Sequence, residues 1–227
     1  MLSISDNIAR IRADIASAAS ASGRSADAVR LIAVTKTVAP ERIAEALEAG
    51  ITDIGENYVQ EAAAKFEALK DYSYTRHMIG SLQSNKAGRA VALFDWVQTV
   101  DSAKLAGRLS EAALATGRKI RVLIEVNIGG EYSKAGMSPE KAGSNLEVVA
   151  AAGGLIVCGL MAIPPVGDEL STRRHFAKLR HIRDRLSSRT GLDLPELSMG
   201  MSSDYALAVE EGATMVRVGR AIFGDRR

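Results

Sequence analysis

Cysteine is almost absent from this sequence, with one residue, Cys158, in a chain of 227. A single cysteine excludes an internal disulfide and is typical of proteins from a reducing compartment. Cys158 lies within the apolar stretch GGLIVCGLMAIPP, and apolar surroundings raise the pKa of a thiol. We therefore interpret it as a small buried hydrophobe rather than a nucleophile.

Long hydrophobic runs and an excess of charge of one sign are also missing. No stretch of about 18 uninterrupted apolar residues suggests a membrane-spanning helix. The N-terminal residues MLSISDNIARIRADIASAA carry charges throughout and predict an amphipathic helix rather than a signal peptide. The 29 basic and 27 acidic residues leave a net charge of +2, too small to recruit nucleic acid or acidic lipid. We expect a cytoplasmic protein without nucleic-acid or membrane partners.

What the sequence does contain is a regular alternation of short apolar runs and longer amphipathic stretches. The runs predict strands at 31–36, 53–57, 76–80, 96–100, 121–128, 155–163, 196–200 and 215–219. The stretches between them predict helices, and this alternation is typical of parallel strands with right-handed crossovers. We predict an α/β fold, a single (β/α)8 TIM-type barrel domain over residues 1–227, with an open doubly wound sheet as the alternative.

The order of the predicted elements is unusual for such a barrel. An extra N-terminal helix is expected before the first strand, whereas only RAIFGDRR follows the last strand. We expect the N-terminal helix to take the place that a final helix would have in the outer ring.

Lys36 comes near the end of the apolar, β-branched run LIAVTKT, which covers Leu31 to Thr37. A buried ammonium group is unfavourable unless it is paired or takes part in chemistry. In a barrel of this type the carboxyl ends of the strands form the active face, so we expect Lys36 at that rim. Other residues expected at the rim are Asn57, Gly80, Asn127, Met161, Met201 and Gly219.

The last two predicted strands are followed by turns rich in glycine and serine. The segment SMGMSSD joins the seventh strand to a helix expected to begin near Ser203 or Asp204, and two glycines bracket the exit of the eighth strand in VGRAIFG. Such turns supply hydrogen-bond donors for a phosphate, and barrels often bind phosphate at this position. We predict a phosphate site here, although single serines and glycines more often serve as caps and turns.

Arg217 alternates with apolar neighbours in the last predicted strand, MVRVG. An arginine that points into a barrel needs a partner. Two interpretations are open: a structural ion pair with an inward carboxylate such as Glu125 or Glu56, or a donor to a heteroatom of a ligand.

A lysine at one strand end and a phosphate cradle at others suit pyridoxal 5′-phosphate. Its aldehyde can form a Schiff base with Lys36, which accounts for an amine at that position. An aldolase or isomerase barrel acting on phosphorylated sugars fits the same residues, so this choice stays open. No metal site is expected.

The ordered motifs AVTKT, IGENYVQE, HMIGSLQSNK, VQTVDS, EVNIGGEYSKAGM, GLMAIPP, LSMGMSSDYALAVEEG and MVRVGRAIFG resemble the pyridoxal phosphate homeostasis protein family. That family is similar to the N-terminal barrel domain of alanine racemases. The resemblance, from about Leu31 to Gly224, implies a fold-type III barrel with pyridoxal 5′-phosphate on Lys36 as a Schiff base. The other cofactor-binding residues that it implies are Asn57, His77, Met161, Ser202, Arg217, Gly219 and Arg220.

The resemblance also implies roles for these residues. Ser202 and the backbone at Gly219 and Arg220 would contact the phosphate, and Arg217 would face the pyridine nitrogen. Asn57, His77 and Met161 look like pocket-lining positions. Arg220 departs from the family, which usually has a serine or threonine there; its guanidinium would either reach the phosphate or turn outward.

By this resemblance the chain is a non-catalytic pyridoxal-phosphate-binding protein of vitamin B6 homeostasis and amino-acid balance. A cationic Arg217 disfavours protonation of the pyridine ring, which makes the ring a poorer electron sink. Alanine racemases use an opposing tyrosine from a second domain, for which this motif pattern shows no equivalent. A weakly active amino-acid racemase is the alternative. We expect a monomer, with apo forms of pyridoxal-phosphate-dependent enzymes as acceptors.

Overall fold

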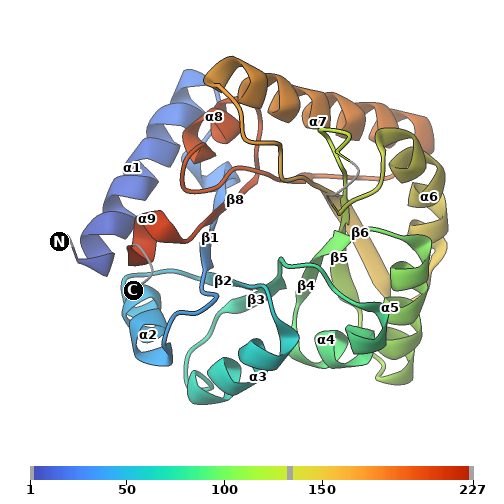
Figure 1. The fold of residues 1–227 in the computed structure, drawn as a ribbon, viewed down its shortest axis with the longest axis horizontal. Helices are drawn as coiled ribbons and strands as arrows, with labels where there is room; N and C mark the ends of the chain where they lie inside the picture. Colours follow the sequence, from blue (N-terminus) through green and yellow to red (C-terminus); the bar gives the residue numbers. More distant parts are fainter. Residues whose placement is uncertain (1–2, 132–134, 225–227) are drawn as a thin grey trace.

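Eight parallel strands form a closed barrel in which each strand pairs with its neighbour in sequence and β1 pairs with β8 (Figure 1). The computed structural model describes residues 3–131 and 135–224. The prediction of a barrel is confirmed, and the open sheet is not formed. The strands are β1 Arg30–Val34, β2 Asp53–Glu56, β3 Thr75–Met78, β4 Trp96–Val100, β5 Ile120–Glu125, β6 Leu155–Met161, β7 Glu196–Ser198 and β8 Met215–Val218.

Helices surround the strands and form the outer layer (Figure 1). The α-helices are α1 Ile4–Ala21, α2 Pro40–Glu48, α3 Val59–Ala68, α4 Ala87–Leu93, α5 Ala103–Ala115, α6 Pro139–Ala151, α7 Glu169–Thr190, α8 Tyr205–Glu210 and α9 Arg220–Phe223. Short 3-10 helices lie at Ala26–Ala28 and Ser84–Lys86. None of the helices in the described part of the chain is long and apolar enough to cross a membrane.

The N-terminal helix α1 completes the ring, as predicted. Ser3 caps its first turn through a reciprocal pair of hydrogen bonds with Asp6. Figure 1 shows α1 alongside α8 and α9, and the Asn7 side chain donates a hydrogen bond of 3.0 Å to the carbonyl of Ile222 in α9. The buried face of α1 repeats at helical spacing through Ile4, Ile8, Ile11 and Ile15.

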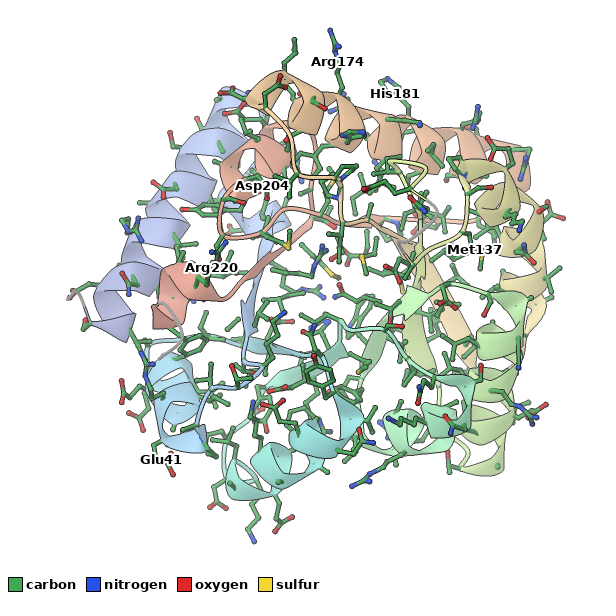
Figure 2. All side chains as sticks on the ribbon, in the orientation of Figure 1. Glu41, Met137, Arg174, His181, Asp204 and Arg220 are labelled. Atoms are coloured by element: carbon green, nitrogen blue, oxygen red, sulfur yellow. The ribbon has the colours of Figure 1, made fainter. Side chains whose placement is uncertain are left out.

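Side chains fill the inside of the barrel, as the sticks in Figure 2 show. Residues of a strand face alternately outward to the helices and inward to the barrel axis. The inward apolar cluster consists of Ile32, Trp96, Leu123, Met161 and Met215. Buried polar side chains also face the inside, among them His77, Gln98, Ser198 and Arg217, whereas barrel layers consist mostly of branched apolar residues.

Cys158 packs against this inward cluster but is half-buried rather than fully buried. Burial raises the pKa of its thiol to about 11. The interpretation of Cys158 as an unreactive packing residue therefore agrees with its surroundings.

The predicted strands extend past the observed ones at their carboxyl ends. The run 31–36 contains strand only to Val34, and 121–128 only to Glu125. One further residue keeps a ladder hydrogen bond in each case, from the Thr35 N–H to the Gly55 carbonyl at 3.0 Å and from the Val126 N–H to the Met161 carbonyl at 2.8 Å. The backbone then turns toward the next helix. The apolar pattern continues into the turns, because turn residues also pack against the barrel.

Candidate cofactor site

Several of the predicted residues lie at the carboxyl ends of the strands. Lys36 follows β1 and is half-buried, and Asn57 directly follows β2. Met161 is the last residue of β6 and is fully buried, and Gly219 directly follows β8. Because all strands are parallel, these residues share one rim of the barrel.

Lys36 lies in a turn in which both neighbouring residues, Thr35 and Thr37, form hydrogen bonds to glutamate side chains. The Thr35 hydroxyl donates a hydrogen bond of 2.6 Å to Glu56 Oε1, and the Thr37 N–H donates one of 2.6 Å to Glu61 Oε1. Thr37 has a φ of 61°, a left-handed conformation that is strained for a β-branched residue. Because Thr35 faces outward, alternation along the chain directs Lys36 toward the inside.

A second lysine, Lys65 of α3, holds this turn from outside the barrel. Its ammonium group donates hydrogen bonds to the Thr35 carbonyl at 2.5 Å, to Glu56 Oε1 at 2.8 Å and to Glu61 Oε1 at 2.6 Å. Lys65 and Glu56 are buried. We call Lys65, Glu56 and Glu61 the Lys65 cluster.

The two carboxylates of the Lys65 cluster differ in their surroundings. Burial raises the pKa of Glu56, although the hydrogen bonds from Lys65 and Thr35 act against this rise. Burial would also raise the pKa of Glu61, but hydrogen bonds from Lys65 and the Thr37 N–H lower it below its ordinary value. Sequence patterns alone do not predict this cluster, since a Glu and a Lys four residues apart are typical of an exposed helix face.

The turns after β7 and β8 meet through Ser202. The Ser202 hydroxyl oxygen accepts hydrogen bonds from the N–H groups of Gly219 and Ala221, both at 3.3 Å. Within the described residues it donates none, so its proton can be directed to an anion. The N–H of Arg220 belongs to the first turn of α9, where helical N–H groups have no intrahelical acceptor.

The turn of Ser202 and Gly219 lies beside the start of the Lys36 turn, because β8 and β1 are neighbours in the closed barrel. A Cβ atom added to Gly219 would lie 3.2 Å from the carbonyl oxygen of Val34. The backbone at Gly219 therefore approaches β1 closely. Figure 2 shows Arg220 at the start of α9, and its side chain is exposed.

Arg217 is buried inside β8, and neither predicted carboxylate forms an ion pair with it. Its guanidinium donates hydrogen bonds to Ser198 Oγ at 2.6 Å and to the Ala162 carbonyl at 3.0 Å. Glu56 pairs with Lys65 instead. Burial lowers the pKa of Arg217 to about 10 while the charge of Glu125 opposes this, so the guanidinium is cationic at neutral pH.

Glu125 ends β5 and is buried. Burial raises the pKa of Glu125 to about 7; the charge of Asp101 adds to this rise and Arg217 opposes it. The rim therefore holds an acidic group that titrates near neutral pH.

Asn57 and His77 have different environments. The Asn57 side-chain oxygen is buried without a hydrogen-bond partner, which leaves it able to accept one from a ligand. His77 lies deeper, fully buried in β3, and both of its ring nitrogens have side-chain partners. Asn57 therefore has a side-chain oxygen that a ligand could bond, whereas both ring nitrogens of His77 are already bonded.

No group of three or more His, Cys, Asp or Glu side chains that could hold a metal ion occurs in residues 3–131 and 135–224. A half-buried amine, an adjacent turn with donors for a phosphate, an unpartnered amide oxygen and a buried cation fit pyridoxal 5′-phosphate. The residues present are therefore compatible with this cofactor.

The fold and the site define a barrel of the kind that alanine racemases contain. The family model described as alanine racemase, N-terminal domain, matches residues 7–227. A pyridoxal phosphate homeostasis protein of Pseudomonas aeruginosa is 44% identical over 227 residues, which cover 100% of this chain and 97% of the relative. The pyridoxal phosphate homeostasis protein of Escherichia coli K12 is 38% identical over 229 residues, which cover 100% of this chain and 98% of the relative. This chain belongs to the pyridoxal phosphate homeostasis protein family.

Solved structures agree with this assignment. PipY of Synechococcus elongatus PCC7942, solved with PLP bound, is 39% identical and superposes with a TM-score of 0.86, covering 97% of this chain and 100% of PipY. An alanine racemase of Clostridium difficile 630 has a TM-score of 0.69 at 16% identity and covers 87% of this chain and 53% of the racemase. The racemase thus shares the barrel fold.

Proposed function

We propose that this chain binds pyridoxal 5′-phosphate through Lys36 and serves intracellular homeostasis of this cofactor and of amino acids. The observation that carries the proposal is the closure of the barrel by β1 and β8, which brings the Lys36 turn next to the turn of Ser202 and Gly219. The adjacency of the two turns supports a site in which the Lys36 amine and hydrogen-bond donors for a phosphate act on one ligand. The names of the full-length relatives support the same function.

Each residue has a distinct task in this proposal. Bound pyridoxal phosphate supplies an aldehyde carbon that condenses reversibly with an amine and releases the aldehyde oxygen as water. Lys36 provides that amine. Ser202 and the N–H groups of the turn after β8 hold the phosphate, the buried Asn57 oxygen accepts a hydrogen bond, and Arg217 faces the ring nitrogen.

The same site supports binding without catalysis. The cationic Arg217 would disfavour protonation of a ring nitrogen held beside it, so the bound cofactor would supply little carbanion stabilisation. Among the described tyrosines, the Tyr205 hydroxyl donates to Asp14 and the Tyr72 hydroxyl to Glu48, both outside the barrel. These two tyrosines are therefore not positioned as an acid opposite Lys36.

The remaining parts of the proposal concern the cellular context. The chain acts in the cytoplasm as a monomer that releases its cofactor to apo forms of pyridoxal-phosphate-dependent enzymes. Reversibility of the Lys36 linkage supports this carrier role, because hydrolysis regenerates the free lysine and the aldehyde.

Deuterium exchange tests the absence of catalysis. Holo-protein incubated with L-alanine in deuterated water is expected to show no exchange at Cα above the rate of free pyridoxal phosphate, because the hydroxyls of Tyr72 and Tyr205 bond carboxylates outside the barrel and supply no acid opposite Lys36. Mass spectrometry of the recovered alanine measures it. Exchange with many turnovers per chain would establish a racemase-type enzyme instead.

A further inference from the structure

Five polar side chains form a continuous hydrogen-bonded row across the inside of the barrel. Arg217 of β8 donates to Ser198 Oγ at 2.6 Å, and the Ser198 hydroxyl donates to Gln98 Oε1 at 2.7 Å. The Gln98 amide lies 3.1 Å from His77 Nδ1, and His77 Nε2 lies 2.8 Å from Asp53 Oδ1. We call these residues the interior chain; it connects β8, β7, β4, β3 and β2.

The interior chain has one consistent direction. Arg217 can only donate, so the Ser198 oxygen accepts from it and the Ser198 proton goes to Gln98 Oε1. The Gln98 NH2 group then donates to His77 Nδ1, and His77 Nε2–H donates to Asp53. Every bond therefore runs from the cation at one end to the carboxylate at the other, and the tautomer of His77 is fixed as Nε2–H.

The far end of the interior chain is anchored. The His77 ring stacks on Trp96 with ring centroids 5.7 Å apart, and the Arg30 guanidinium lies 5.5 Å from the Trp96 ring. Arg30 also lies 3.8 Å from Asp53. Burial lowers the pKa of His77, which keeps it neutral. Burial would raise the pKa of Asp53, but the hydrogen bonds from His77 and Thr52 and the charge of Arg30 together lower it.

A purely structural role does not account for this arrangement. Gln98, His77 and Ser198 have 0% exposure, and burying polar groups is costly compared with apolar side chains of similar volume. The interior chain ends at Arg217, which is its one residue that contacts the cofactor in the proposed function. An amide in its middle cannot pass a proton along without isomerising, so the row orients groups rather than conducting protons.

We propose that Gln98 and His77 are positioning residues that hold the Arg217 guanidinium, through Ser198, in the orientation that selects a ligand ring with a nitrogen acceptor. This inference rests on the proposed function. Arg217 has a second fixed contact, with the Ala162 carbonyl at 3.0 Å. The two contacts together restrict rotation of the guanidinium plane, which a single contact would leave free.

The test compares two ligands in the wild-type protein and in variants with single substitutions. Pyridoxal phosphate is titrated against its analogue in which C–H replaces the ring nitrogen, and Schiff-base absorbance reports binding. In Gln98→Leu the apparent affinity for pyridoxal phosphate is expected to fall about tenfold, the size of one hydrogen bond to a charged group. Affinity for the analogue is expected to change less than about twofold, because the analogue has no acceptor for Arg217.

Two further variants control the test. Ser110→Ala removes a buried hydroxyl that bonds the Gly153 carbonyl outside the interior chain, and it is expected to leave the preference between the ligands unchanged. Ser198→Ala cuts the link between Arg217 and Gln98 with little loss of volume, so it replaces Gln98→Leu if that variant does not fold. It is expected to lose the preference as well.

The outcomes separate the inference from the proposed function. Equal weakening of both ligands by Gln98→Leu or Ser198→Ala, or an unchanged preference, would overturn the positioning role. If the wild-type protein forms no Schiff base with either ligand, the proposed function itself fails. Addition of Gln98→Leu to Arg217→Met is expected to cause no further change in preference, since Gln98 acts through Arg217.

Discussion

Replacement of Lys65 by methionine is expected to lower the free energy of unfolding by about 3–5 kcal/mol at neutral pH, the usual cost of removing one partner from a buried ion pair. Lys65 bonds two carboxylates and the Thr35 carbonyl, and Glu56 beside it is fully buried. Methionine fills a similar volume but satisfies none of these groups. Urea unfolding followed by the fluorescence of Trp96 measures the loss.

The cost of Lys65→Met is also expected to depend on pH. Without Lys65, the already raised pKa of Glu56 rises further, so the native variant takes up a proton on Glu56 more readily than wild type. Glu61 has a lowered pKa in the wild type, and its contribution to stability is present above its unfolded pKa and lost as pH falls through its folded pKa. Both effects make the difference between variant and wild type smaller in acid.

Lys70→Met is the matched control. Lys70 pairs with Glu67 at 3.1 Å on the exposed face near the end of α3, so its removal is expected to cost less than about 1 kcal/mol at any pH. A difference of that size for Lys65→Met as well would show that the Lys65 cluster contributes little to the stability of the turn around Lys36.

Gly80→Ala is expected to destabilise the protein by about 3 kcal/mol, at the upper end of the cost of overpacking. A Cβ atom at Gly80 would lie 2.3 Å from the Asn57 carbonyl oxygen and 2.6 Å from the Asn57 Cα. Backbone atoms cannot rotate away, so Asn57 must move and its buried side-chain oxygen with it. Thermal unfolding measures the loss, and pyridoxal phosphate titration is expected to show weaker binding.

Gly88→Ala provides the comparison at a glycine with open surroundings. Nothing lies within 4 Å of a Cβ atom there, and Gly88 is inside α4. The substitution is expected to stabilise the helix by up to about 1 kcal/mol and to leave cofactor binding unchanged. If Gly80→Ala behaves like Gly88→Ala, the close approach to Asn57 does not constrain the site.

Local patterns in the sequence were enough to predict the barrel and the position of its rim. The β-branched run before Lys36 and the glycine-rich turn around Gly219 mark the ends of β1 and β8. Parallel strands bring such ends to one face, so Lys36, Asn57 and Gly219 share a rim without any need for detailed packing. The place of the N-terminal helix in the outer ring was predicted from the order of helices and strands along the sequence.

Contacts between distant segments were beyond prediction from these patterns. Gln98 lies in the apolar run WVQTV, and its partner Ser198 is 100 residues away, so only the closed barrel brings the two together. Of the two interpretations left open for Arg217, the ion pair with Glu125 or Glu56 is not formed, and the guanidinium bonds a hydroxyl and a carbonyl instead. Lys65 became recognisable as a support for the Lys36 turn only from its burial against β2.

The most direct test of the account is to identify the amine that binds the cofactor. Protein loaded with pyridoxal phosphate is reduced with borohydride, digested and mapped by mass spectrometry. The account predicts that the reduced pyridoxyl phosphate is found on Lys36, in stoichiometric amount. An added mass on other lysines with Lys36 unmodified, or no added mass at all, would contradict it.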